Sequence, residues 1–130
     1  MSRYSFGITV EEPFPAAVEH VTAALADQGF GVLTTIDVQA TLARTLGVER
    51  SPYVILGACN PPLAHQALEA EPDAGALLPC NVFVRQDEGG VYVGFMDPHA
   101  VLGLIENDGI EPLAAEVGRR LELVRDALAG

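Results

Sequence analysis

The sequence predicts an α+β fold, with helices packed on one face of a single five-stranded sheet that is mixed or antiparallel. Apolar patterns of strand-like and helix-like period follow one another in the order β-α-β-α-β-α-β-β-α. The turn signal Asp87-Glu88-Gly89-Gly90 predicts a hairpin between the last two strands. A doubly wound parallel sheet is the second choice. It is disfavoured by the hairpin and by the lack of a glycine-rich phosphate loop, because Gly29-Phe30-Gly31 precedes a strand rather than a helix.

The first strand is predicted from Arg3 to Val10, where apolar residues alternate with small or polar ones. Pro13 and Pro15 then open a helix, because proline is tolerated in a first turn. Gly29 is a favourable residue to end it. The apolar stripe of this helix has helical spacing and consists of Phe14, Ala17, Val18, Val21 and Leu25.

A short helix is predicted between the second and third strands. Phe30 to Ile36 is rich in β-branched residues and predicts the second strand. Asp37 can cap the helix that follows, and Gly47 can end it. Tyr53 to Cys59 is a continuous apolar run, which predicts a central strand covered on both faces.

The rest of the chain alternates in the same way. Asn60 caps a third helix that ends near Pro72. The hairpin strands are predicted over Asn81–Arg85 and Val91–Met96, and a short helix is expected around Ala100–Ile105. The last helix has the apolar stripe Leu113, Val117, Leu121, Val124 and Leu128.

Composition excludes several classes of partner. The length of 130 residues suits one domain over 1–130. Acidic residues number 18 and basic residues 7, all of them arginine, which gives a formal net charge of -11. Such a surface repels phosphate backbones and anionic lipids, so no nucleic acid and no membrane is expected as a partner. Without a membrane span or a signal peptide pattern, we expect a cytoplasmic protein whose two cysteines are thiols.

Three proline- and asparagine-rich points lie where apolar strands end or begin: Cys59-Asn60-Pro61, Pro79-Cys80-Asn81 and Asp97-Pro98-His99. If the strands are neighbours, these points meet at one edge of the sheet. Cys59 would precede a helix, where backbone N–H groups and the helix dipole favour negative charge, so its thiol could be a nucleophile or a metal ligand. The alternative is a small buried side chain beside a helix cap.

The candidate ligand-binding residues are therefore Cys59, Asn60, Cys80, Asn81, Asp97 and His99. Cys59 and Cys80 are also candidates for a two-thiol site that binds a soft metal or is reversibly oxidised. Their long spacing fits neither a zinc-ligand pattern nor a C-x-x-C redox motif. Asp97 either caps a short helix or orients His99. No catalytic residue and no cofactor can be assigned.

Four segments carry a resemblance to a known family: Asp27 to Leu33, Ile55 to Pro61, Leu77 to Val82, and Asp97-Pro98. In this order and spacing they resemble the bacterial and archaeal family called domain of unknown function 302, over almost the whole chain. The resemblance implies a compact α+β domain that is often a homodimer. It implies no activity, cofactor or catalytic residue.

Three functions remain open. The first choice is a module that binds a small molecule or an anion near Cys59-Asn60-Pro61 and Pro79-Cys80-Asn81. The second is a thiol-based redox or metal-binding protein that uses Cys59 and Cys80. The third is a homodimeric structural or interaction protein without chemistry, in which the motif residues stabilise turns and a sheet edge. Whether the protein is an enzyme is left open.

Overall fold

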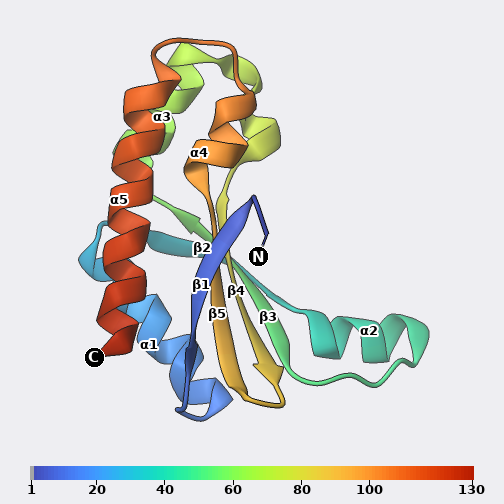
Figure 1. Cartoon of the computed structure of the whole chain (residues 1–130). Coiled ribbons are helices and arrows are strands. Elements are labelled where there is room, and N and C mark those ends of the chain that lie inside the picture. Colours follow the sequence, from blue (N-terminus) through green and yellow to red (C-terminus); the bar gives the residue numbers. More distant parts are fainter. Residues whose placement is uncertain (1) are drawn as a thin grey trace.

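The computed structural model describes residues 2–130 and contains one five-stranded sheet and a set of helices (Figure 1). The elements in chain order are β1 (Ser5–Val10), α1 (Phe14–Asp27), β2 (Gly31–Asp37), α2 (Val38–Leu46), β3 (Tyr53–Cys59), α3 (Pro61–Ala70), the 3₁₀ helix η1 (Pro72–Leu77), β4 (Cys80–Asp87), β5 (Gly90–Met96), α4 (Pro98–Val101), the 3₁₀ helix η2 (Leu102–Leu104) and α5 (Ile110–Ala129).

The sheet is antiparallel throughout. Its strand order is β1-β5-β4-β3-β2, and each neighbouring pair runs antiparallel. The predicted α+β class is therefore confirmed in its antiparallel form, and the doubly wound parallel alternative is wrong. The predicted hairpin is β4–β5, with Asp87 opposite Gly90.

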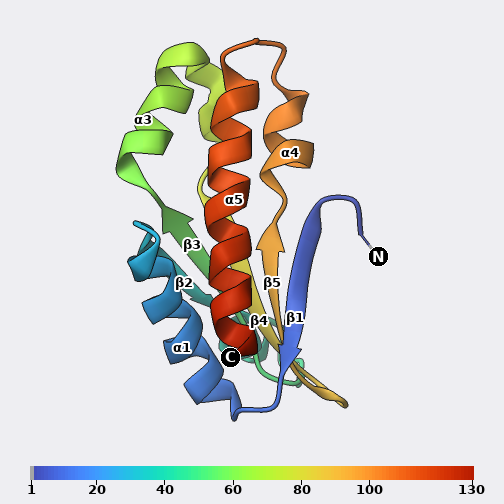
Figure 2. The same ribbon diagram turned by 60° about the vertical axis from the view of Figure 1, so that its left-hand side comes forward.

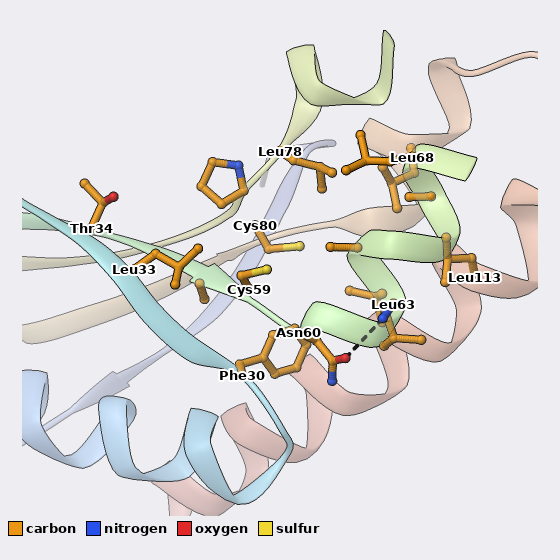
Figure 3. A pocket seen from close by; sticks show the side chains of 16 residues that line it. Phe30, Leu33, Thr34, Cys59, Asn60, Leu63, Leu68, Leu78, Cys80 and Leu113 are labelled. Carbon is orange, nitrogen blue, oxygen red and sulfur yellow. Dashed lines mark hydrogen bonds between the residues drawn. The ribbon is translucent and has the colours of Figure 1, made fainter. Parts of the chain in front are cut away.

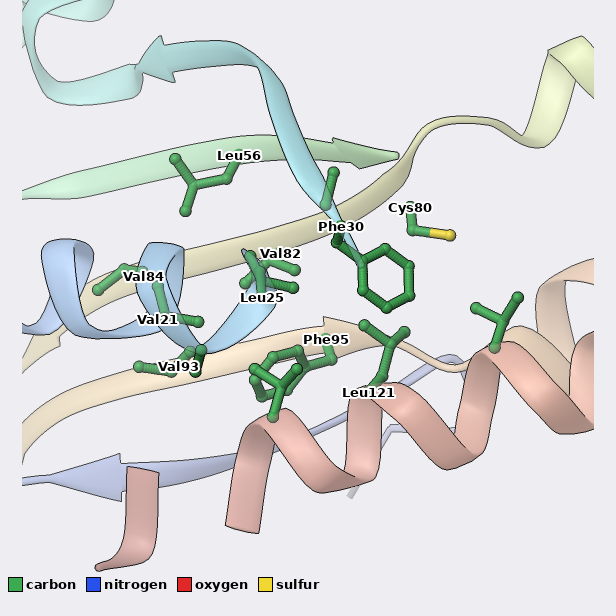
Figure 4. Close-up of a cluster of buried hydrophobic side chains, with 14 of the residues drawn as sticks. Val21, Leu25, Phe30, Leu56, Cys80, Val82, Val84, Val93, Phe95 and Leu121 are labelled. Atoms are coloured by element: carbon green, nitrogen blue, oxygen red, sulfur yellow. The ribbon is translucent and has the colours of Figure 1, made fainter. Parts of the chain in front are cut away.

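The hydrophobic core lies between the sheet and the helices α1 and α5. Val21 and Leu25 of α1 and Leu121 of α5 point toward the inner face of the sheet (Figure 4). The strand residues that meet them alternate along each strand, as expected for a sheet with one covered face. They include Leu56, Val82, Val84, Val93 and Phe95.

Helix α5 extends past the end of the sheet. With 20 residues it is about 30 Å long, since an α-helix rises 1.5 Å per residue. Its C-terminal part lies beside α1, whereas its N-terminal part lies beside α3 and α4, beyond the strands (Figure 2). A second group of helices therefore packs where β3 ends and β4 begins, and this junction forms the candidate site.

Helix α2 projects from the body of the molecule and has no buried residue (Figure 1). Both of its predicted ends are confirmed. The Asp37 side chain accepts a hydrogen bond from Ala40 N at 2.9 Å, and Gly47 ends the helix with a φ of 66°, a conformation that favours glycine.

Strand β3 lies between β4 and β2, but its two faces are not equally covered. Val54 and Leu56 are buried under the helices, whereas Tyr53 and Ile55 on the other face are only half-buried. The predicted coverage of both faces is therefore wrong for this part of the strand. The apolar run in the sequence is continuous because the outer face of β3 also carries apolar side chains.

Candidate functional site

Strand register places the two cysteines at one end of the sheet. Cys59 is the last residue of β3 and Cys80 is the first residue of β4. In the antiparallel ladder Ala58 is paired with Cys80, and Gly31 at the start of β2 is paired with Cys59. The chain between the two cysteines forms α3 and η1, and α3 lies beyond this end of the sheet (Figure 2).

A pocket of about 320 Å³ opens at this junction, and we call it the thiol pocket (Figure 3). Its volume is at the lower end of the range for small-molecule sites. The wall is almost entirely apolar, with no charged residue among those that line it. The lining residues are Phe30, Leu33, Thr34, Ala58, Cys59, Asn60, Leu63, Ala64, Ala67, Leu68, Leu78, Pro79, Cys80, Leu102, Leu113 and Val117.

The two sulfur atoms face this pocket from neighbouring strands, and both cysteines are free thiols (Figure 3). They differ in environment, because Cys59 is half-buried whereas Cys80 is buried. Burial and, to a smaller extent, the nearby Cys59 together raise the pKa of Cys80 to about 11. Cys80 is therefore a protonated thiol at neutral pH, which makes it a weak nucleophile.

Asn60 caps helix α3, as the sequence predicts. Its Oδ1 accepts a hydrogen bond from Leu63 N at 3.2 Å. Among residues 2–130, Asn60 is the one polar or charged residue that is buried. Its amide lies against Gly29, where a Cβ atom would come within 2.9 Å of Asn60 Nδ2. Asn60 thus fixes the start of α3 and, with it, one wall of the thiol pocket.

The other three predicted site residues lie outside the thiol pocket. Asn81 is exposed and lines a separate hollow on the outer face of the sheet. Asp97 caps the short helix α4, where its Oδ1 accepts a hydrogen bond from His99 N at 2.9 Å. His99 is exposed and lines a third hollow, beside α5. The structure therefore brings together Cys59, Asn60 and Cys80, but not all three motif points.

Sequence reasoning did not find the apolar wall of the pocket. Leu113 and Val117 of α5 are predicted only as residues of an apolar stripe, and the sequence assigns no role to Leu63 and Ala67 of α3. One available signal was the small side chains of Ala64 and Ala67 on the inner side of α3, because short side chains leave room between a helix and its neighbours.

Comparison with known proteins finds a matching family and a similar solved structure. The sequence model of the family described as "Domain of unknown function DUF302" matches residues 6–128. A crystal structure of an uncharacterized conserved DUF302 protein from Bacillus stearothermophilus is similar, with 28% sequence identity and a TM-score of 0.89. That similarity covers 97% of this chain and 98% of the other. No curated protein matches the chain.

Proposed function

We propose that this chain, which belongs to the DUF302 family of domains of unknown function, is a module that binds one small apolar molecule in the thiol pocket. The observation that carries the proposal is the apolar pocket at the point where the Cys59-Asn60-Pro61 and Pro79-Cys80 segments meet. A concave, largely apolar wall with few polar groups is the usual form of a small-molecule site.

The chemistry of the wall favours an uncharged ligand over an anion. No arginine lines the pocket, and an ion moved from water into such surroundings would lose its hydration without gaining a partner. The cap of α3 also uses one of the helix N–H groups that could otherwise bind an anion. An apolar ligand, in contrast, gains about 25 cal/mol for each Å² that it removes from water.

A metal site through Cys59 and Cys80 has less support. Structural zinc takes four ligands from Cys, His, Asp or Glu. Within residues 2–130, no group of three or more such side chains is arranged to hold a metal ion.

The experiment is a fluorescence titration with N-phenyl-1-naphthylamine, a neutral apolar probe that brightens in apolar surroundings. We expect saturable binding by the wild type. The change Ala67→Leu fills the pocket from a buried position on α3 and should weaken binding about tenfold or more, which corresponds to about 1.4 kcal/mol. Gln66→Leu is the matched control, because it adds the same side chain at an exposed position of α3 outside the pocket wall.

Equal binding by the Ala67→Leu and Gln66→Leu variants would show that the probe binds elsewhere. A wild type without saturable binding would also contradict the proposal.

A second candidate function, assembly into a homodimer, is favoured by the surface of β2, α2 and the segment that follows. Strand β2 has a neighbour on one side only within the described chain. Large apolar side chains lie exposed there: Leu33 at 70%, Ile36 at 45%, Leu46 at 70% and Val48 at 44%. A second copy that pairs with this edge about a twofold axis would cover these side chains.

A further inference from the structure

We propose that the thiol pocket takes an apolar electrophile of the α,β-unsaturated aldehyde or ketone class, which adds reversibly to the sulfur of Cys59. This inference rests on the proposed function and goes further, because it names the chemical class of the ligand and the atom that holds it.

The first reason is the composition of the pocket wall. Apart from the thiols, the polar side-chain groups that line it are the Thr34 hydroxyl and the Asn60 amide. Neither is a nucleophile without an activating base. A thiol is the one group in this wall that reacts with a soft carbon electrophile. The apolar wall would bind the hydrocarbon part of such a ligand and hold its reactive end beside the sulfur atoms.

The second reason is the difference between the two thiols. Cys80 is only 6% exposed, and its raised pKa keeps it protonated at neutral pH. Cys59 is half-buried, and its sulfur faces the pocket (Figure 3). Cys59 is therefore the attachment point. Cys80 contributes a neutral side chain to the wall and resembles a small apolar residue in this role.

The addition step balances without a further reactant. The Cys59 sulfur attacks the β-carbon of the ligand, and a carbon–sulfur bond forms. The electron pair of the carbon–carbon double bond shifts to form a double bond between the α-carbon and the carbonyl carbon, while the π pair of the carbonyl group moves to its oxygen and gives an enolate. The proton from the thiol passes through water to the α-carbon, so the net change is addition of S–H across the double bond. No oxidant or reductant is needed, and the reverse reaction releases the ligand.

The test compares trans-2-nonenal, an apolar enal, with acrylamide, a small polar electrophile. Adduct formation is followed by intact-protein mass spectrometry, and the site is found by peptide mapping. Each rate is divided by the rate for free N-acetylcysteine. We expect one adduct, at Cys59, and a normalised rate about tenfold higher for nonenal than for acrylamide. A tenfold preference corresponds to about 1.4 kcal/mol of binding before reaction.

Variants separate attachment from binding. Cys59→Ser should give no adduct, whereas Gln66→Leu, at an exposed position outside the pocket wall, should form the adduct at the wild-type rate. Ala67→Leu should remove the preference for nonenal over acrylamide, because the longer side chain fills the space that the hydrocarbon part of nonenal would occupy.

The outcomes distinguish this inference from the proposed function. Saturable probe binding together with no preference for nonenal would overturn the inference and leave the proposed function standing. An adduct at Cys80, or at a residue outside the pocket, would also overturn it. Failure of both probe binding and the nonenal preference would overturn both proposals.

Discussion

At the scale of single residues, the thiol pocket is formed by side chains whose positions are set by the ends of helices and strands. It is not formed by a cluster of reactive groups. Asn60 is buried at the start of α3, where its side chain caps the first turn, and Cys80 is buried because it begins β4 on the covered face of the sheet. Their positions at element ends were predicted from the sequence. Which other side chains face them could not be predicted, because that depends on how α3 and α5 pack over the sheet.

The raised pKa of Cys80 predicts a specific dependence of stability on pH. The thiol pKa is 9.0 in the unfolded reference and about 11 in the fold, so both states are protonated below pH 9. As the pH rises from 9 to 11, the unfolded chain loses this proton while the folded chain keeps it. The free energy of unfolding should therefore fall over this window, by on the order of 2 kcal/mol.

Urea unfolding of the wild type and of Cys80→Ala at pH 8 and pH 11 measures the contribution of Cys80 to this fall in the free energy of unfolding. The variant lacks the thiol, so the free energy of unfolding of the wild type should fall more than that of the variant. Equal falls in both proteins would show that Cys80 is not buried as described.

At the scale of elements, α2 differs from the other long helices because it buries none of its residues. A helix of nine residues is only marginally stable by itself in water, so the caps at its two ends contribute to its stability. The sequence predicts the caps through Asp37 and Gly47. It cannot predict that the helix leaves the body of the molecule, because its apolar residues have the same spacing as those of a packed helix.

The exposed surface of α2 predicts how the proposed homodimer can be disrupted. Leu46→Glu replaces an apolar side chain that is 70% exposed with a charged one, and the charge should prevent the proposed dimer from forming. Size-exclusion chromatography with light scattering should then show a monomer. Leu104→Glu is the matched control, because Leu104 is 72% exposed but lies on η2, and this variant should remain a dimer. A monomeric wild type, or a dimeric Leu46→Glu variant, would contradict the proposed interface.

At the scale of the whole molecule, the sequence predicts which helices and strands form better than it predicts how they are arranged in space. The strands, the hairpin and the last helix follow from local periodicity. The order β1-β5-β4-β3-β2 does not, because pairing between distant strands leaves no local signal. The pocket depends on this arrangement, since it forms where α5 extends past the sheet and α3 continues beyond the end of β3.

The net charge is -11. No helix within residues 2–130 has the length and apolar character needed to cross a membrane.

The place where the proposed apolar ligand binds can be located from amide NMR spectra recorded during a titration with N-phenyl-1-naphthylamine. If the ligand occupies the thiol pocket, we expect the largest shifts on pocket residues of three elements, such as Cys59, Leu63 and Val117. Shifts confined to the outer face of the sheet, around Tyr53 and Phe83, would contradict it, because that face lies across the sheet from the helices that form the pocket wall.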